Sequence, residues 1–423
     1  MNTVLILIFI VGYIAIATEN FIHINKAASA LITGVLCWTV YILQSDFAAV
    51  NTELAEHLSE IAGILFFLLG AMTIVELIDA HDGFEIITSR INTSSKRKLL
   101  WITCLLAFFL SAVLDNLTTA IVMVSLVRKL ILEKQLRLIF CGMIVIAANA
   151  GGAWSPIGDV TTTMLWIGGQ ITITNIIINT FIPSLISLIV PLIAMSLKLK
   201  GTIANKETQP QTSSTLFRAK ERNLIFFSGI GVLLLVPVFK TITHLPPFMG
   251  MLLGLGLIWV LTEIIHKEKT ADKSALSVQY ALRKIDSASI LFFLGILASV
   301  AALESTGVLH TVAKTFDTTL KDDRLIVGTI GILSSIVDNV PLVAATIGMY
   351  SMVQFPTDHH FWQFLAYCAG TGGSILIIGS AAGIAAMGIE KIDFFWYLRK
   401  ISWLALLGYI AGALVFILQS RLF

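Results

Sequence analysis

The sequence predicts an all-α polytopic membrane protein, built as an inverted repeat of five spans plus one re-entrant hairpin in each half, with broken helices. Three observations predict this fold class. The chain is 57% hydrophobic and only 13% charged, whereas a soluble chain carries about 25% charged residues. Apolar runs long enough to cross a bilayer recur from end to end. One polar phrase occurs twice inside this apolar sequence.

The apolar runs predict the individual spans. In the first repeat, 1–197, they cover about 2–18, 25–44, 59–79, 136–166 and 174–197. In the second repeat, 221–423, they cover about 221–241, 247–265, 288–306, 361–390 and 400–420. The polar segment 198–220 is the expected cytoplasmic linker. The N-terminus has no basic region and no cleavage site, so it is interpreted as a span rather than a signal peptide.

Two further apolar stretches, about 98–130 and 324–353, each hold an Asp-Asn pair near the middle. Each stretch is too long for one span and has no polar loop at which to turn. Both facts favour a re-entrant hairpin with Asp-Asn at its tip. Such irregular backbone persists at membrane depth only where protein or a water-filled cavity surrounds it.

The two halves also match in sequence. Residues 111–120 (SAVLDNLTTA) reappear as 334–343 (SSIVDNVPLV), and 149–159 (NAGGAWSPIGD) corresponds to 370–380 (GTGGSILIIGS). Because each repeat crosses the membrane an odd number of times, the second is inverted. Matching glycines are expected to unwind the middle of the spans 136–166 and 361–390. They are Gly151, Gly152, Gly158, Gly372, Gly373 and Gly379.

The basic residues predict the orientation. If both termini lie outside, all but five of the 28 Lys and Arg residues fall inside, Lys26 among them. This distribution satisfies the positive-inside rule. The first hairpin then opens inside and the second outside. We expect a multi-pass protein of the bacterial inner (cytoplasmic) membrane. The five outside residues are Lys240, Lys314, Lys321, Arg324 and Arg421.

The two Asp residues of the repeated phrase are the first candidates for chemistry. A carboxylate at membrane depth costs about 2.5–3.5 kcal/mol on insertion scales, so it indicates function. Carboxylate, amide and hydroxyl oxygens suit a small hard cation rather than a transition metal. Alternatively, each Asp only caps the returning helix. The candidate ion-binding groups are Asp115 and Asp338, and their expected neighbours are Ser111, Asn116, Thr118, Ser334 and Asn339.

Asp159 lies inside the first glycine break, and its counterpart in the second repeat is Ser380. We interpret Asp159, with Thr161 nearby, as a ligand or a proton carrier; capping of the next helix is the alternative. Asn149 and Ser374 are weaker candidates that fit plain interhelical hydrogen bonding equally well. Glu76, near a span end, is ambiguous because such carboxylates are usually solvated.

The paired Ser-x-x-x-Asp-Asn motifs and the segment 152–161 (GAWSPIGDVT) resemble the ion transporter superfamily, and within it the NhaD-type sodium/proton antiporters. The resemblance implies ten or so spans, two opposed hairpins, a homodimer, and exchange of Na+ or Li+ for protons. It implies Na+ binding at Asp115, Asn116, Asp338 and Asn339. It also implies roles for Ser111, Asn149, Asp159, Thr161, Ser334 and Ser374.

We therefore expect a secondary antiporter that exchanges cytoplasmic sodium for external protons, with no cofactor and no nucleic-acid partner. The charged tips would repel a dicarboxylate, and the sequence suggests no Lys or Arg near them. The alternatives are a Na+-coupled organic-anion (dicarboxylate or citrate) or arsenite transporter and a channel. We expect no enzyme, because an intramembrane aspartyl protease carries Gly-x-Gly-Asp, to which only residues 157–159 come close.

Overall fold

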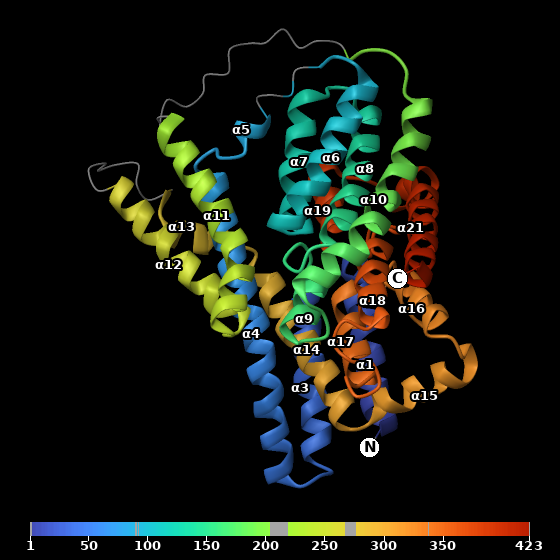
Figure 1. Ribbon diagram of the computed structural model, residues 1–423. Coiled ribbons are helices and arrows are strands. Elements are labelled where there is room, and N and C mark those ends of the chain that lie inside the picture. The colour runs from blue at the N-terminus through green and yellow to red at the C-terminus, as the bar shows by residue number, and fades with distance from the viewer. Residues whose placement is uncertain are drawn as a thin grey trace.

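The computed structural model describes residues 2–88, 91, 93–203, 219–266, 276–336 and 338–422, and this part of the chain is helical apart from its connections (Figure 1). The first half holds α1 (Asn2–Ala17), α2 (Glu19–Ile22), α3 (Lys26–Ile42), α4 (Phe47–Ala80), α5 (Glu85–Thr88), α6 (Lys96–Leu114), α7 (Asn116–Leu130), α8 (Lys134–Gly152), α9 (Val160–Ile167) and α10 (Ile173–Lys198). The second half holds α11 (Ala219–Thr243), α12 (Pro247–Ile265), α13 (Val278–Lys284), α14 (Ser287–Ser305), α15 (Val308–Leu320), α16 (Asp323–Leu333), α17 (Asn339–Met349), α18 (His360–Gly372), α19 (Ala381–Glu390), α20 (Phe394–Tyr397), the π-helical turn η2 (Leu398–Ser402) and α21 (Trp403–Leu422).

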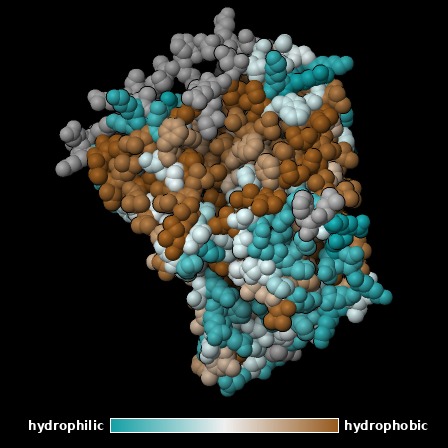
Figure 2. Space-filling model, viewed as in Figure 1, coloured by the Kyte–Doolittle hydropathy of each residue, from teal (hydrophilic) through white to brown (hydrophobic). Residues whose placement is uncertain are grey.

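The described residues form 8 helices that are long and apolar enough to cross a membrane. Figure 2 shows hydrophobic side chains over the upper part of one face, where α10, α11 and α12 lie, and hydrophilic ones over the lower part. Exposed Ile178, Phe227 and Val260 belong to these helices. Apolar side chains turned outward in this way are typical of a lipid-facing surface, so the predicted polytopic membrane protein is confirmed.

One helix begins well before its predicted span. The third span was expected from residue 59, whereas α4 begins at Phe47. Asp46 caps this helix by accepting the backbone N–H of Ala49 at 3.0 Å. The intervening segment is polar but rich in helix-forming Glu, Leu and Ala, so the helix continues through it.

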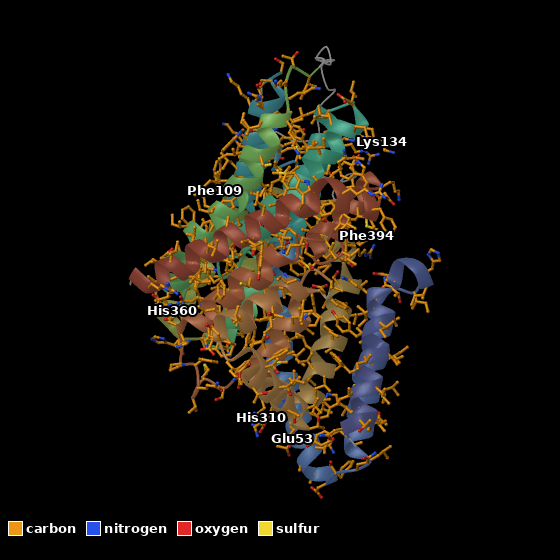
Figure 3. All side chains as sticks on the ribbon, turned by 90° about the vertical axis from the view of Figure 1, so that its right-hand side faces the viewer. Glu53, Phe109, Lys134, His310, His360 and Phe394 are labelled. Atoms are coloured by element: carbon orange, nitrogen blue, oxygen red, sulfur yellow. The ribbon has the colours of Figure 1, made fainter. Side chains whose placement is uncertain are left out.

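Two of the basic loops lie together at one end of the molecule. The backbone N–H of Ile203 donates to the carbonyl of Ser94 at 2.7 Å, which joins the loops before α6 and after α10. In Figure 3, Lys134 lies near this end, and Glu53 and His310 lie at the other. Some basic residues assigned to the inside lie outside the described residues, as does segment 204–218 of the linker: Arg90, Lys206, Arg218, Lys267, Lys269 and Lys273.

Each stretch predicted as a re-entrant hairpin forms two helices, with its Asp-Asn pair at the start of the second one. In the first, the chain begins and ends at the same side, because Lys96 at the start of α6 pairs with Glu133 just after α7 at 3.4 Å. In the second, the hydroxyl of Tyr350 after α17 donates to Asp317 before α16 at 3.0 Å. Figure 1 shows α6 and α7 in the upper half and α16 and α17 in the lower half. The hairpins therefore occupy opposite halves of the molecule.

Each broken helix packs tightly on the first arm of a hairpin. The helix α8 ends at Gly152, and α18 ends at Gly372. A Cβ atom on Gly151 would overlap the carbonyl of Phe108 in α6, and one on Gly372 would overlap the carbonyl of Gly331 in α16. Glycine permits this close backbone approach. The same contact in both halves agrees with an internal repeat.

After each break the chain joins the second arm of the opposite hairpin. The helix α9 contacts α17, and α19 contacts α7. Figure 1 likewise shows α9 near α17 and α19 near α7. This exchange places the N-terminal ends of four short helices (α7, α9, α17 and α19) around the centre of the molecule.

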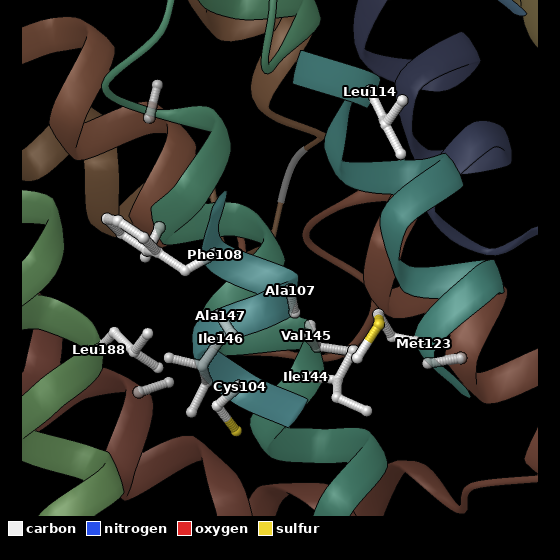
Figure 4. Close-up of a cluster of buried hydrophobic side chains, with 14 of the residues drawn as sticks. Cys104, Ala107, Phe108, Leu114, Met123, Ile144, Val145, Ile146, Ala147 and Leu188 are labelled. Atoms are coloured by element: carbon white, nitrogen blue, oxygen red, sulfur yellow. The ribbon is translucent and has the colours of Figure 1, made fainter. Parts of the chain in front are cut away.

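The helix α8 lies in the core, with buried residues on every side. Figure 4 shows Ile144 and Val145 turned toward Met123 of α7, and Ile146 turned toward Leu188 of α10. Without a strong hydrophobic driving force in lipid, such close packing holds transmembrane helices together. The core therefore provides a rigid support for the break that follows α8.

Candidate functional site

Asp159 is the centre of the candidate site. It is 2% exposed and occupies the N-cap position of α9 with an extended backbone. Its Oδ1 accepts the backbone N–H and the hydroxyl of Thr161, both at 3.0 Å. Capping, the alternative interpretation for this residue, therefore does occur. The positive end of the α9 dipole also favours a negative charge at this position.

Both hairpin tips reach the same carboxylate. The amide Nδ2 of Asn116 donates to Asp159 Oδ2 at 2.7 Å, and the amide Nδ2 of Asn339 donates to the same oxygen at 3.2 Å. Both Asn side chains are buried. Capping leaves Oδ2 free, so one aspartate both caps its helix and connects the two opposed hairpins.

Asn149 extends this network to the second repeat. Its Oδ1 accepts the amide of Asn116 at 3.2 Å, and its Nδ2 donates to the hydroxyl of Ser380 at 2.9 Å. Ser380 caps α19 by accepting the backbone N–H of Gly383 at 3.2 Å. It therefore fills the capping role of Asp159 without a charge. We call Asn116, Asn149, Asp159, Asn339 and Ser380 the central cluster.

Asp115 caps the returning arm of the first hairpin. Its Oδ1 accepts the backbone N–H of Thr118 at 2.7 Å, and its Oδ2 accepts the Thr118 hydroxyl at 2.8 Å. The φ angle of 87° makes Asp115 the sharp break between α6 and α7. The capping alternative thus describes this copy of the phrase, in which both carboxylate oxygens have local partners.

Asp338 has no such cap. Pro341 stands three residues later, where the first copy has Thr118, and proline offers neither a backbone N–H nor a hydroxyl. The Asp338 carboxylate instead pairs with the ammonium of Lys26, with 3.5 Å between Nζ and Oδ2. The side chains of Lys26 and Asp338 are only 16% and 10% exposed.

The expectation that no Lys or Arg lies near a tip is therefore wrong. Lys26 was assigned to an inside loop, but it is the first residue of α3. Asn25 caps α3 by accepting the backbone N–H of Ala27 at 2.8 Å. This cap fixes the start of the helix and therefore the position of Lys26. The contact joins residues 312 positions apart, so sequence proximity gives no indication of it.

The carboxylates also act on one another. Asp159 interacts electrostatically with both Asp115 and Asp338. In the part of the chain that the structure describes, these three carboxylates therefore lie near one another, and Lys26 pairs with one of them in surroundings where charges are poorly screened. The site as a whole attracts cations.

Other predicted residues have structural partners. The hydroxyls of Ser111 and Ser334 donate to the carbonyls of Ala148 at 2.6 Å and Ala369 at 2.9 Å, which bonds each hairpin to its broken helix. The Ser374 hydroxyl donates to the carbonyl of Thr371 at 2.6 Å, so the structure does not bring it into the central cluster.

Glu76 lies in the wall of a cavity of about 370 Å³ that also borders Lys26 and Thr118. Its carboxylate pairs with Lys284 at 3.2 Å. Burial acts to lower the pKa of Lys284, but the hydrogen bond and charge of Glu76 outweigh this and raise the pKa above its ordinary value. Glu76 is thus held by a charged lysine rather than only solvated.

Comparison with known proteins identifies the family. A family model described as "Citrate transporter" matches residues 13–362. The chain belongs to this family. "Sodium/proton antiporter 1" of Arabidopsis thaliana is 49% identical over 98% of this chain and 72% of its own length. "Na(+)/H(+) antiporter NhaD" of Vibrio cholerae is 32% identical over 98% of this chain and 91% of its own. The resemblance to NhaD-type antiporters is thereby confirmed.

Two residues that shape the surroundings of Asp338, Lys26 and Pro341, were not named as site residues from the sequence. Lys26 is the first Lys or Arg in the sequence, and the next is Arg90, so its isolation in a long apolar region was a usable signal. Pro341 in place of Thr118 was a second signal, because only one of the two copies can cap its own Asp.

Proposed function

We propose that this protein is a secondary antiporter that exchanges cytoplasmic Na+ or Li+ for external protons. The observation that carries the proposal is the buried Asp159, which receives amides from the tips of both opposed hairpins. The names of the plant and Vibrio relatives support the same reaction.

Competition between Na+ and protons for the same carboxylates can couple the movement of one ion to that of the other. An acidic group away from water favours its protonated form, and a bound cation favours the ionised form, so a proton and Na+ compete for one group. Each tip Asn has an amide oxygen as well as a nitrogen. A turn of either amide therefore replaces a donor to Asp159 with an oxygen ligand for Na+. Asp115 and Asp338 supply the remaining negative charge.

Opposed hairpins suit alternating access. The first hairpin and the second lie in opposite halves of the molecule, and their tips meet at the central cluster (Figure 1). A site between two inverted repeats can be exposed to one side at a time when one bundle moves against a scaffold. We propose this movement in a homodimer of the bacterial inner membrane, with both termini on the outer side.

Organic-anion transport is the second candidate, because the family model is described as a citrate transporter. Helix N-termini and Lys26 are groups that receive anions. In this chain, however, the carboxylate of Asp159 already accepts both tip amides, and Asp338 neutralises Lys26. The groups that would bind a substrate carboxylate are thus occupied by the protein's own carboxylates, which favours a cation substrate.

Reconstituted proteoliposomes test the proposal. A pH-sensitive dye reports proton movement when Na+, Li+ or K+ is added, and we expect a response to Na+ and Li+. Asp338→Asn should abolish it. Asp46→Asn is the matched control, because this exposed residue caps α4 and Asn also caps well. Uptake of labelled citrate or succinate without proton movement would overturn the proposal, as would Na+ flux that moves no protons.

A further inference from the structure

Lys26 lies where three adjoining cavities meet. The large cavity of about 370 Å³ is lined by Lys26, Glu19 and Lys284. A second, of about 50 Å³, borders Asp115 and Asn116, and a third, of about 40 Å³, borders Asp338 and Tyr13. Lys26 lines all three. Lys26 therefore lies at a boundary that the large cavity shares with the two smaller cavities at the tip carboxylates.

The ammonium is held without a rigid cage. It lies 3.5 Å from Asp338 and 4.3 Å from the ring centroid of Phe292. A lysine carries a compact point charge on a flexible four-carbon stem, so it can leave one carboxylate for another. Several carboxylates line these cavities, and Glu19 is the one that lines two of them together with Lys26 and also accepts the Lys26 backbone N–H, at 3.2 Å.

The position that the Lys26 ammonium occupies beside Asp338 is also one that a transported cation can occupy. Asp338 has no capping donor because of Pro341, so Lys26 is the charged partner that the structure gives it. A buried carboxylate that loses its partner is costly. Another cation of the same charge can replace that partner, and the net charge around the tips then stays the same.

We propose that Lys26 is a tethered competitor of the transported cation. Its ammonium neutralises Asp338 when Na+ is absent, and it moves toward Glu19 when Na+ takes its place. This inference rests on the proposed antiport, and it adds a residue that sets the affinity for Na+. Na+ binding is weakened by the competition, and Na+ release is helped by the returning ammonium.

Two substitutions test the inference, because they should change the half-maximal Na+ concentration in opposite directions. Lys26→Gln removes the competitor, so the Na+ concentration that gives half-maximal exchange should fall at least about fivefold, in the range of measured site-to-site couplings. Glu19→Gln removes the alternative partner of the displaced ammonium, so that concentration should rise. Lys26→Arg keeps the charge but not the compact ammonium, so its half-maximal Na+ concentration should lie above that of Lys26→Gln. The measurements are made in proteoliposomes at one alkaline pH, where protons compete least.

Lys240→Gln is the matched control. Lys240 also lies half-buried, with its ammonium on the carbonyl of Trp166 at 2.8 Å, but it borders none of the three cavities described above. The Lys240→Gln substitution should therefore leave the half-maximal Na+ concentration unchanged.

The outcomes separate the inference from the proposed function. If the unchanged protein moves no protons in response to Na+, the antiport itself is wrong. If it does, and both Lys26→Gln and Glu19→Gln keep the same half-maximal Na+ concentration, the competitor role is overturned. If Lys26→Gln fails to fold, Glu19→Gln decides alone: a raised concentration supports the inference and an unchanged one overturns it.

Discussion

The two hairpin tips carry the same Ser-x-x-x-Asp-Asn phrase but treat their carboxylates differently. Asp115 is held by the backbone N–H and hydroxyl of Thr118. Asp338 has Pro341 at that position and pairs with Lys26 from a distant helix. The Asn residues of both tips, in contrast, converge on Asp159.

Asp115 is a carboxylate with fixed partners, whereas Asp338 is a carboxylate whose cationic partner can be exchanged. Both oxygens of Asp115 have partners within three residues, so this carboxylate is bound to its own helix. The partner of Asp338 is a long, flexible side chain that another cation can replace. A repeated motif therefore need not repeat its chemistry. In an inverted repeat, one copy can position the site while the other admits the ion.

Replacing Asp159 should have the largest effect, because it removes the group that both tips share. Loss of a buried charged partner costs about 3–5 kcal/mol, which corresponds to more than about 100-fold in affinity. Asp159→Asn should therefore abolish Na+-dependent proton movement in proteoliposomes. Ser380→Ala, at the uncharged counterpart, should retain most of it. Equal losses in both variants would contradict the central position of Asp159.

Removing the tip amides should come next. A hydrogen bond to a charged group contributes about 1.5–3 kcal/mol. Asn116→Ala should raise the half-maximal Na+ concentration more than Asn339→Ala, because Asn116 makes the shorter bond to Asp159 and a further bond to Asn149. Titration of exchange against Na+ checks the order. A larger effect of Asn339→Ala would show that the second tip dominates binding.

Making the tips alike should have an intermediate effect. Pro341→Thr supplies the N–H and hydroxyl that cap Asp115 in the first copy, so Asp338 should become capped and compete less well for Na+. A cap contributes about 1.4 kcal/mol, within the usual range, so we expect about a tenfold rise in half-maximal Na+. Thr118→Pro is the reverse change and should free Asp115. If the half-maximal Na+ concentration of Pro341→Thr is unchanged, the proposal that Pro341 keeps Asp338 uncapped for Na+ is wrong.

The two Ser residues should matter least, and equally. Ser111→Ala and Ser334→Ala each remove one bond between a hairpin and its broken helix, and we expect each to lose about 1 kcal/mol of stability. Thermal unfolding of the purified protein measures this loss. The half-maximal Na+ concentration should stay nearly constant. A large rise would show instead that the hydroxyls bind the ion.

Much of the fold follows from the sequence for clear reasons. Apolar run length, the paired Asp-Asn phrases and the matched glycines are local signals, and they predict the spans, the hairpins and the breaks after Gly152 and Gly372. The start of α4 was missed because its polar first turns resemble a loop in hydropathy while their residues favour helix.

The site was predicted in composition but not in arrangement. Asn116, Asn339 and Asp159 were all named from the sequence, yet only the packing of α9 against α17 brings Asn339 to Asp159. Lys26 was misplaced for the same reason, because its partner lies on the other repeat. Side-chain partners across a repeat interface depend on tertiary packing, which local patterns do not specify.

Proton release on Na+ binding tests the central claim most directly. Purified protein in a weakly buffered detergent solution is titrated with Na+ at a pH where the site is partly protonated, and the released protons are counted. The account predicts that Na+ displaces protons from the unchanged protein and that Asp159→Asn releases fewer or none. Binding of Na+ to the unchanged protein with no proton release would contradict it.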